Sequence, residues 1–364
     1  MKQINKWIKA AAIIALMLPF NNSFAGNPQR AGQAGASELL INPWARTSGW
    51  GGSNIAGVRG LEGIFSNVAG LAFTEKTELI FSQTQWLKTG DDAVADISSF
   101  GFSQKVGESG VLGLSIMNMS FGDILITTVN NPDGGIGFYS PTLMNIGVSY
   151  AKIFSNSIYG GVTVKMISEQ ISNVTANGVA LDAGIQYVTG SKDNLKFGIS
   201  LKNVGPRISF TGDGLSFRGI AGDDDDYKMT VEQRSSELEL PALLNIGISY
   251  DINMGSRNRI TGAGTFTSNS FQKDQYCLGG EYSYNEMFML RLGYTYEDGI
   301  QFSENYSYNN NEADYRTTAL RGPSAGFTVE LPMGDNGSTF GLDYSYRHTD
   351  PFQGSHTIGA RINL

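Results

Sequence analysis

The sequence predicts an all-β protein, a 14-stranded antiparallel transmembrane β-barrel, and three observations favour this fold class. Short segments in which apolar and small polar residues alternate run from about Thr77 to the last residue, as in Leu195–Lys202. Gly, Ser, Asp and Lys occupy the polar phase of nearly every segment, which is unusual for the buried face of a soluble sandwich. The 46 glycines, 16 tyrosines and 20 phenylalanines suit strands and tight turns, and only 16% of the residues are charged.

The first 25 residues have the pattern of a secretory signal peptide. Three lysines precede a short apolar run at residues 10–18, and a small-residue pattern follows at residues 23–25. The apolar run is shorter than the roughly 20 residues that a membrane-spanning helix needs. We therefore expect cleavage after Ala25, export, and insertion of the barrel into the outer membrane.

Residues 26–76 do not alternate and are predicted to form a plug, or hatch, inside the barrel. Apolar residues recur here at helical spacing and give one apolar face on a short helix that Gly70 closes. The residues of this face are Leu61, Ile64, Phe65, Val68 and Leu71. The segment is too long for a mere linker, so a plug in the lumen is the simplest interpretation. A periplasmic docking arm is the alternative.

Residues 77–364 are predicted to form the barrel. The expected strand centres are Phe81, Gly101, Leu114, Val148, Val162, Ala183, Ile199, Ile248, Gly264, Gly280, Leu292, Phe327, Leu342 and Ala360. Their even number is what a single-chain bacterial barrel requires. Tight connections such as 107–108 and 285–286 alternate with connections that are longer on average, such as 121–141, 203–240 and 298–320. This alternation predicts periplasmic turns, external loops and both termini in the periplasm.

Charged side chains of both signs occupy the inward phase of the strands. The predicted lumen charges are Lys165, Asp182, Lys196, Lys202, Asp251, Glu281, Arg291, Asp343, Arg347 and Arg361. Similar numbers of both signs favour a lumen cross-linked by ion pairs over a filter for ions of one sign. The most ordinary interpretation is the packing of a polar interior.

Signals for catalysis and metal binding are weak. The two histidines, His348 and His356, flank a predicted external loop with Asp350 and Ser355, where a barrel hydrolase would place a Ser-His-acid set. A solvated loop is the simpler interpretation, so we expect no enzyme activity and no cofactor. There is no His-rich or Cys-rich cluster for zinc, and the acidic run 223–226 lacks the ligand spacing of a calcium loop. We therefore expect no metal, and a net charge of −8 argues against a nucleic-acid partner.

Three motifs before the first strand resemble the PorV/PorQ family of Bacteroidota: LLINPWAR at 39–46, GGSNIA at 51–56 and SNVAGLA at 66–72. They are more distantly similar to FadL-type transporters, whose hatch carries Asn-Pro-Ala-Gly-Leu-Ala, with Val68 in place of the proline. The strand at 197–205 also looks like this family. The resemblance implies a FadL-like barrel in the outer membrane that works beside a larger machine, because PorV-like proteins partner the type IX secretion translocon.

Two functions remain open from the residues. An accessory or adaptor barrel in protein export or envelope assembly is favoured, because apolar residues in the long loops suit a partner surface. These partner-surface candidates are Leu125, Ile126, Phe138, Tyr139, Leu215, Phe217 and Met229. The alternative is a FadL-like transporter of hydrophobic small molecules, which needs an apolar pocket in the lumen. The expected partners are outer-membrane lipid and a larger outer-membrane complex.

Overall fold

The computed structural model describes residues 26–364 except 91, 221–227, 298–316, 335–336 and 351. The predicted signal peptide and the acidic run 223–226 lie outside the described residues. In the part of the chain that is described, no helix is long and apolar enough to cross a membrane.

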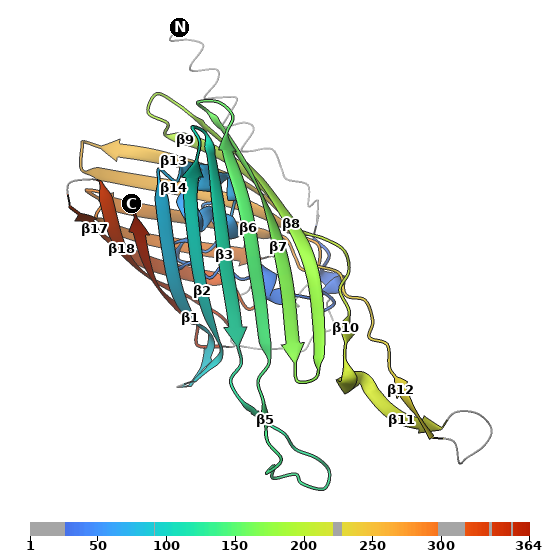
Figure 1. Ribbon diagram of the computed structural model, residues 1–364. Helices are drawn as coiled ribbons and strands as arrows, with labels where there is room; N and C mark the ends of the chain where they lie inside the picture. The colour runs from blue at the N-terminus through green and yellow to red at the C-terminus, as the bar shows by residue number, and fades with distance from the viewer. Residues whose placement is uncertain (1–25, 91, 221–227, 298–316, 335–336, 351) are drawn as a thin grey trace.

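Among the described residues, 14 antiparallel strands close into a barrel (Figure 1). They are β1 (Thr77–Thr89), β2 (Asp92–Val106), β3 (Gly110–Ser120), β6 (Thr142–Ile153), β7 (Ile158–Ile171), β8 (Val174–Thr189), β9 (Leu195–Val204), β13 (Leu243–Met254), β14 (Asn258–Asn269), β15 (Gln275–Tyr284), β16 (Phe288–Glu297), β17 (Gly322–Met333), β18 (Ser338–Arg347) and β19 (Ser355–Asn363). The barrel closes where β1 pairs with β19, with Glu78 opposite Asn363. Every predicted strand centre falls within one of these strands, so the predicted barrel and its strand number are confirmed.

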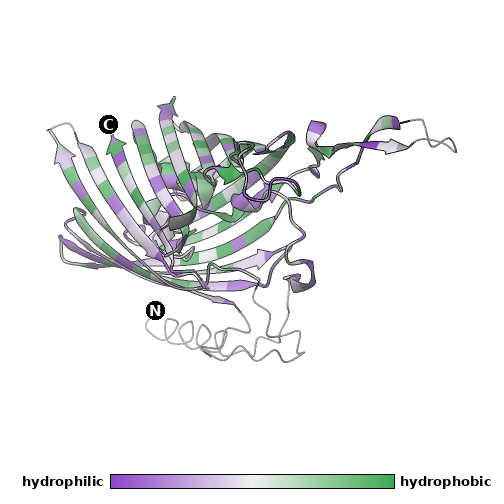
Figure 2. Ribbon diagram, turned by 90° about the horizontal axis from the view of Figure 1, so that it is seen from below, coloured by the Kyte–Doolittle hydropathy of each residue, from purple (hydrophilic) through white to green (hydrophobic). Residues whose placement is uncertain are grey.

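Side chains along the strands alternate between the outer face and the lumen. On β9, Phe197 and Ile199 are exposed on the outer face, whereas Lys196 and Ser200 are buried on the inner one. Figure 2 shows the resulting hydrophobic and hydrophilic bands along the strands. The exposed apolar side chains of the outer face form the surface that a lipid bilayer requires.

The connections between strands separate the two ends of the barrel, which we call the turn end and the loop end. Both ends of the barrel sequence lie at the turn end, where the Leu364 amide donates to the Thr77 carbonyl at 2.9 Å. Two long loops extend from the loop end (Figure 1). The first carries β4 (Ile124–Leu125) and β5 (Phe138–Tyr139), and the second carries β10 (Phe210–Thr211), η5 (Asp213–Leu215), β11 (Ser216–Ile220) and β12 (Lys228–Glu232).

Two of the connections expected to be longer are in fact tight, because only two residues separate β1 from β2 and β7 from β8. Only Ser172 and Asn173 join β7 to β8 at the loop end, so the expected alternation of short and longer connections fails there. Ser172 has φ +52°, the left-handed conformation that two-residue hairpin turns require. The β7–β8 hairpin therefore ends without a loop of its own.

Residues 26–76 lie against the inner face of the strands. They form η1 (Pro28–Arg30), η2 (Ser37–Leu40), α2 (Ala45–Gly49), η3 (Gly60–Phe65) and η4 (Val68–Phe73). The expected single helix closed by Gly70 is wrong, because η3 ends before Ser66 and Gly70 lies inside η4. Asn67 causes the break: its side chain caps η4 by accepting from the Ala69 amide and also donates to the wall carbonyl of Ile185.

Candidate functional site

Inward-facing glycines of the strands make room for residues 26–76. A Cβ atom added to Gly198 of β9 would lie 2.8 Å from the Cα of Ala56. One added to Gly161 of β7 would lie 2.8 Å from the carbonyl oxygen of Val68. Real side chains do not tolerate contacts this short, so the N-terminal segment packs directly on the backbone of the barrel wall.

The five residues predicted to form the apolar face of the plug are all buried, each 7% exposed or less. Leu61, Ile64, Phe65 and Leu71 join one apolar cluster with inward side chains of β1, β2, β3 and β6. Val68 instead packs against the backbone of Gly161. That this segment closes the lumen to solutes stays a prediction.

Largely buried ion pairs attach the N-terminal segment to the last strands of the barrel. The Arg46 guanidinium of α2 lies 2.9 Å from Glu330 and 3.3 Å from Asp343. Glu62 of η3 lies 3.6 Å from the Arg361 guanidinium of β19 and 3.9 Å from Arg46. Buried charges such as these depend on their partners, because removing one leaves the others uncompensated. The network therefore joins α2 and η3 to β17, β18 and β19.

Burial shifts the ionisation of carboxyl groups in this segment. Burial raises the pKa of Glu62 to about 7, even though Arg46 favours its carboxylate form. Burial, and to a lesser extent the facing carboxylate of Glu169, raises the pKa of Glu38 to about 8. The pKa values of both carboxyl groups lie well above the usual range for glutamate, because both groups are strongly desolvated.

Most of the predicted lumen charges meet partners across neighbouring strands. The shortest pairs are Lys165–Asp182 at 2.5 Å, Lys196–Asp251 at 2.6 Å and Arg291–Glu281 at 2.8 Å. Lys202 donates instead to the Phe65 carbonyl at 2.7 Å, and Arg347 donates to the Leu320 carbonyl at 3.4 Å. Asp343 and Arg361 belong to the network around α2 and η3. The lumen charges therefore bind neighbouring strands to each other and also bind the N-terminal segment to the strands.

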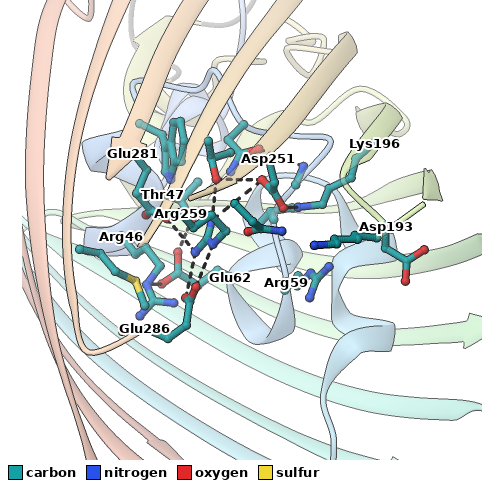
Figure 3. A pocket seen from close by; sticks show the side chains of 18 residues that line it. Arg46, Thr47, Arg59, Glu62, Asp193, Lys196, Asp251, Arg259, Glu281 and Glu286 are labelled. Atoms are coloured by element: carbon teal, nitrogen blue, oxygen red, sulfur yellow. Dashed lines mark hydrogen bonds and ion pairs between the residues drawn. The ribbon is translucent and has the colours of Figure 1, made fainter. Parts of the chain in front are cut away.

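A polar cavity of about 370 Å³ lies towards the turn end, between the N-terminal segment and the strands from β9 to β16 (Figure 3). Five basic and five acidic side chains line it. Arg259 lies among three of the acidic ones: 3.3 Å from Glu281, 2.9 Å from Glu286 and 3.9 Å from Asp251. Such a balanced, charged lining suits water and polar groups rather than an apolar ligand.

The loop half of the lumen has an apolar wall, which differs from the expectation of a polar inner face throughout. Its inward side chains are Trp86, Ala95, Ile97, Met117, Met119 and Leu143, with Phe121 just beyond β3. Register places Trp86 opposite Ala95 and Met119 opposite both Ile97 and Leu143, so they form one continuous patch. Trp44 and Leu61 of the N-terminal segment belong to the same apolar cluster. We call this surface the apolar wall.

Two of the residues considered for catalysis, Ser355 and His356, lie on opposite faces of one strand. Ser355 and His356 are consecutive on β19, so their side chains point to opposite faces of the sheet. Ser355 is buried, while His356 Nδ1 lies 2.8 Å from the Tyr344 hydroxyl. Asp350 pairs with Arg321 at 2.7 Å. Ser355 and His356 therefore do not belong to one Ser-His-acid set.

The partner-surface candidates lie in the two long loops that extend from the loop end (Figure 1). Leu125, Phe138, Phe217 and Met229 are exposed, whereas Ile126, Tyr139 and Leu215 are half-buried. In the β11–β12 hairpin, Phe217 pairs with Val231 and Gly219 pairs with Met229. Since alternate residues share a face, these side chains give the hairpin one apolar face.

Two solved structures with a similar fold are a hydrocarbon channel and a toluene transporter. The CymD monoaromatic hydrocarbon channel is 13% identical with a TM-score of 0.51, and the match covers 89% of this chain and 97% of that chain. The toluene transporter TodX of Pseudomonas putida is 13% identical with a TM-score of 0.50, covering 88% and 97%. The barrel shares the fold of these two proteins. No family model matches the sequence, and no curated protein is significantly similar to it. The resemblance to the PorV/PorQ family stays a prediction.

Sequence reasoning missed several charged residues that build the site. Arg259 and Glu330 share the inward phase of β14 and β17, so the alternation of those strands could have identified them. Arg46 and Glu62 lie in the segment that does not alternate, where no periodicity indicates which way a side chain points. Their partners become visible only when the segment is placed inside the barrel.

Proposed function

We propose that this protein is a FadL-like outer-membrane channel for hydrophobic small molecules, with residues 26–76 as its gate. The observation that carries the proposal is the apolar wall, which leads from the loop end to Trp44 and Leu61 of the N-terminal segment. Methionine side chains are flexible and polarizable, so Met117 and Met119 suit apolar ligands of varied shape.

In this proposal the loop end is external and both termini are periplasmic. An apolar solute would enter from the loop end and bind against the apolar wall. The polar cavity beside Arg259 would then be the exit towards the periplasm, and the N-terminal segment separates the two. Passage therefore requires α2 and η3 to move, which strains the buried ion pairs of Arg46 and Glu62. The fold shared with a hydrocarbon channel and a toluene transporter supports this assignment.

Uptake of a labelled monoaromatic hydrocarbon by bacteria that produce the protein tests the proposal. We expect uptake above that of cells lacking the protein, and a several-fold loss in Met117→Ser, which makes the apolar wall polar. Met254→Ser is the matched control, because Met254 lies on the exposed outer end of β13. Uptake that equals the background, or that falls equally in both variants, contradicts the proposal.

The apolar face of the β11–β12 hairpin supports a second candidate, an adaptor barrel of a larger outer-membrane complex such as a type IX secretion system. Phe217 is 52% exposed on this hairpin, away from the barrel wall. Replacing Leu215 and Phe217 together by Ser would release a co-purifying outer-membrane protein while the barrel stays folded. If no protein is recovered with the wild type, the adaptor candidate is rejected.

A further inference from the structure

The outer face of β1, β2 and β3 is polar at a level where the outer face of other strands is apolar or aromatic. Gln85, Ser98 and Asn118 each lie eight positions from the turn-end limit of their strand. The outward residues at the same position of eight other strands are Met166, Leu181, Ile246, Phe266, Tyr276, Tyr296, Ala325 and Tyr346. Since the strands of one barrel share a similar tilt, equal positions lie at a similar depth in the membrane.

The register of the strands joins these polar side chains into one surface. Gln83 faces Ser98 across β1 and β2, and Ser98 faces Asn118 across β2 and β3. Two residues nearer the loop end, Gln85 faces Asp96. The Ser98 hydroxyl donates to the Gln83 amide oxygen at 2.6 Å, which leaves the other amide groups of this surface facing outwards. We call these five residues the polar outer patch.

The polar outer patch lies on the reverse side of the apolar wall. Ile97 and Met117 alternate with the patch residues along β2 and β3, and both are buried in the lumen. Towards the turn end, Phe81 faces Phe100 on the outer face, and both rings are exposed. These strands are therefore polar outside and apolar inside in their loop half, and they are apolar outside in the half below it.

The chemistry of the patch indicates what covers it. Amide and hydroxyl groups at the depth of lipid are costly to leave without hydrogen bonds, because hydrocarbon offers no partner. Lys and Arg clusters recognise anionic headgroups, but the patch has neither residue, and its only charge is Asp96. Amides and hydroxyls both donate and accept hydrogen bonds, so they match the hydroxyl groups of a neutral sugar.

The size and position of the patch favour a lipid headgroup over a protein partner. Three neighbouring strands span about 10 Å, and two levels of outward residues span about 7 Å, so the patch covers on the order of 200 Å². A stable protein interface buries about 800 Å² on each partner. The patch also continues the lipid-facing surface and reaches the loop end of the β1–β2 hairpin, where Thr89 faces Asp92. A headgroup can reach it from that side.

We propose that the polar outer patch binds the neutral sugar headgroup of a glycolipid in the outer leaflet of the outer membrane. The sugar hydroxyls exchange hydrogen bonds with the amides of Gln83, Gln85 and Asn118, and the acyl chains lie on Phe81 and Phe100. The inference rests on the orientation given under the proposed function, in which the loop end is external. It does not depend on what crosses the lumen, so a failed uptake experiment leaves its test intact.

Native mass spectrometry of the purified protein in detergent tests the proposal. The protein is incubated with equal amounts of digalactosyl diacylglycerol, phosphatidylcholine and phosphatidylglycerol that carry the same acyl chains. We expect the wild type to retain the glycolipid several-fold over both phospholipids. The triple variant Gln83→Leu, Ser98→Leu and Asn118→Leu should retain the glycolipid and phosphatidylcholine equally.

Gln104→Leu is the matched control, because Gln104 is also exposed on the outer face of β2 but lies near its turn end. This variant should keep the wild-type preference. Heat-modifiable migration on gels verifies that each variant is folded, and the substitutions place leucine on a face that contacts lipid. If the triple variant does not fold, the wild-type preference among the three lipids still decides.

Four results would overturn the proposal. Equal retention of all three lipids by the wild type would mean that the patch contacts only water. Preference for phosphatidylglycerol would mean that a phosphate, rather than a sugar, is recognised. An unchanged glycolipid preference in the folded triple variant would place the sugar elsewhere. A wild-type dimer that the triple variant converts to monomers would show that a second copy covers the patch.

Discussion

Glu62 and Arg361 lie 3.6 Å apart inside the lumen, although one precedes the first strand and the other belongs to the last. Arg46 extends this contact to Glu330 of β17 at 2.9 Å. Ion pairs therefore attach the N-terminal segment to the last strands of the barrel, and apolar contacts attach it to the first strands. This two-sided attachment is the physical basis for treating the segment as a gate.

Replacing Arg46 by Ala should loosen the segment. The change leaves Glu62, Glu330 and Asp343 without this cation, and removing one partner of a buried ion pair costs about 3–5 kcal/mol. Limited proteolysis should then cleave residues 26–76 faster while the strands stay intact. Arg207→Ala is the control, because its pair with Glu239 is exposed and such pairs contribute about 0–1 kcal/mol. Equal cleavage of both variants would refute the role of the network.

The attachment should depend on pH through Glu62. Because burial raises its pKa from 4.5 to about 7, the folded state holds this proton more tightly than the unfolded state. Its contribution to stability is thus complete below about pH 4.5 and is lost as the pH rises through about 7. We expect the midpoint of heat-modifiable unfolding of the wild type, relative to Glu62→Gln, to fall over this range. A relative rise would mean that the arginines stabilise the carboxylate instead.

A methyl group on the barrel wall should displace the segment. In Gly198→Ala the new Cβ would lie 2.8 Å from the Cα of Ala56, and overpacking of this kind typically costs about 1–3 kcal/mol. Amide hydrogen exchange at residues 53–58 should accelerate. Gly262→Ala on β14 is the control, because nothing lies within 4 Å of the added atom. Unchanged exchange in Gly198→Ala would show that the segment does not pack on this strand.

The outer face should reject charge near the middle of the membrane. Ile248 lies at the middle of β13 and is 46% exposed on the outer face. Ile248→Arg should cost about 2–4 kcal/mol of folding free energy in lipid, and Ile248→Leu much less. Urea titration of folding into lipid vesicles measures both changes. If the two variants fold equally well, this face does not contact lipid.

Strand alternation predicted most of the fold from the sequence. The phase that puts Lys196 and Ser200 inward and Phe197 outward is the phase that the structure has. The prediction of a polar inner face was wrong where both faces of a strand are apolar. On β3, for example, Leu112 is exposed on the outer face and Met117 is buried on the inner face. Such near-continuous apolar runs are typical of strands covered on both sides, and this signal could have predicted the apolar wall.

The N-terminal segment was harder to predict for a physical reason. The short helices η3 and η4 follow the shape of the lumen rather than one helical periodicity, and Asn67 breaks the expected helix by bonding to the wall. The predicted apolar residues were buried all the same, because hydrophobic burial does not require a regular helix. The facing carboxyl groups of Glu38 and Glu169 could not be predicted, since only the folded chain brings them together.

Conductance in planar lipid bilayers tests most directly the claim that residues 26–76 gate the channel. The mature full-length chain should give small or no steady conductance, because the segment packs against the wall on both sides of the lumen. A chain lacking residues 26–74 but still able to insert should give sharply larger conductance. Equal conductance of the two proteins would contradict the account, because the lumen would then be open, or closed, without the segment.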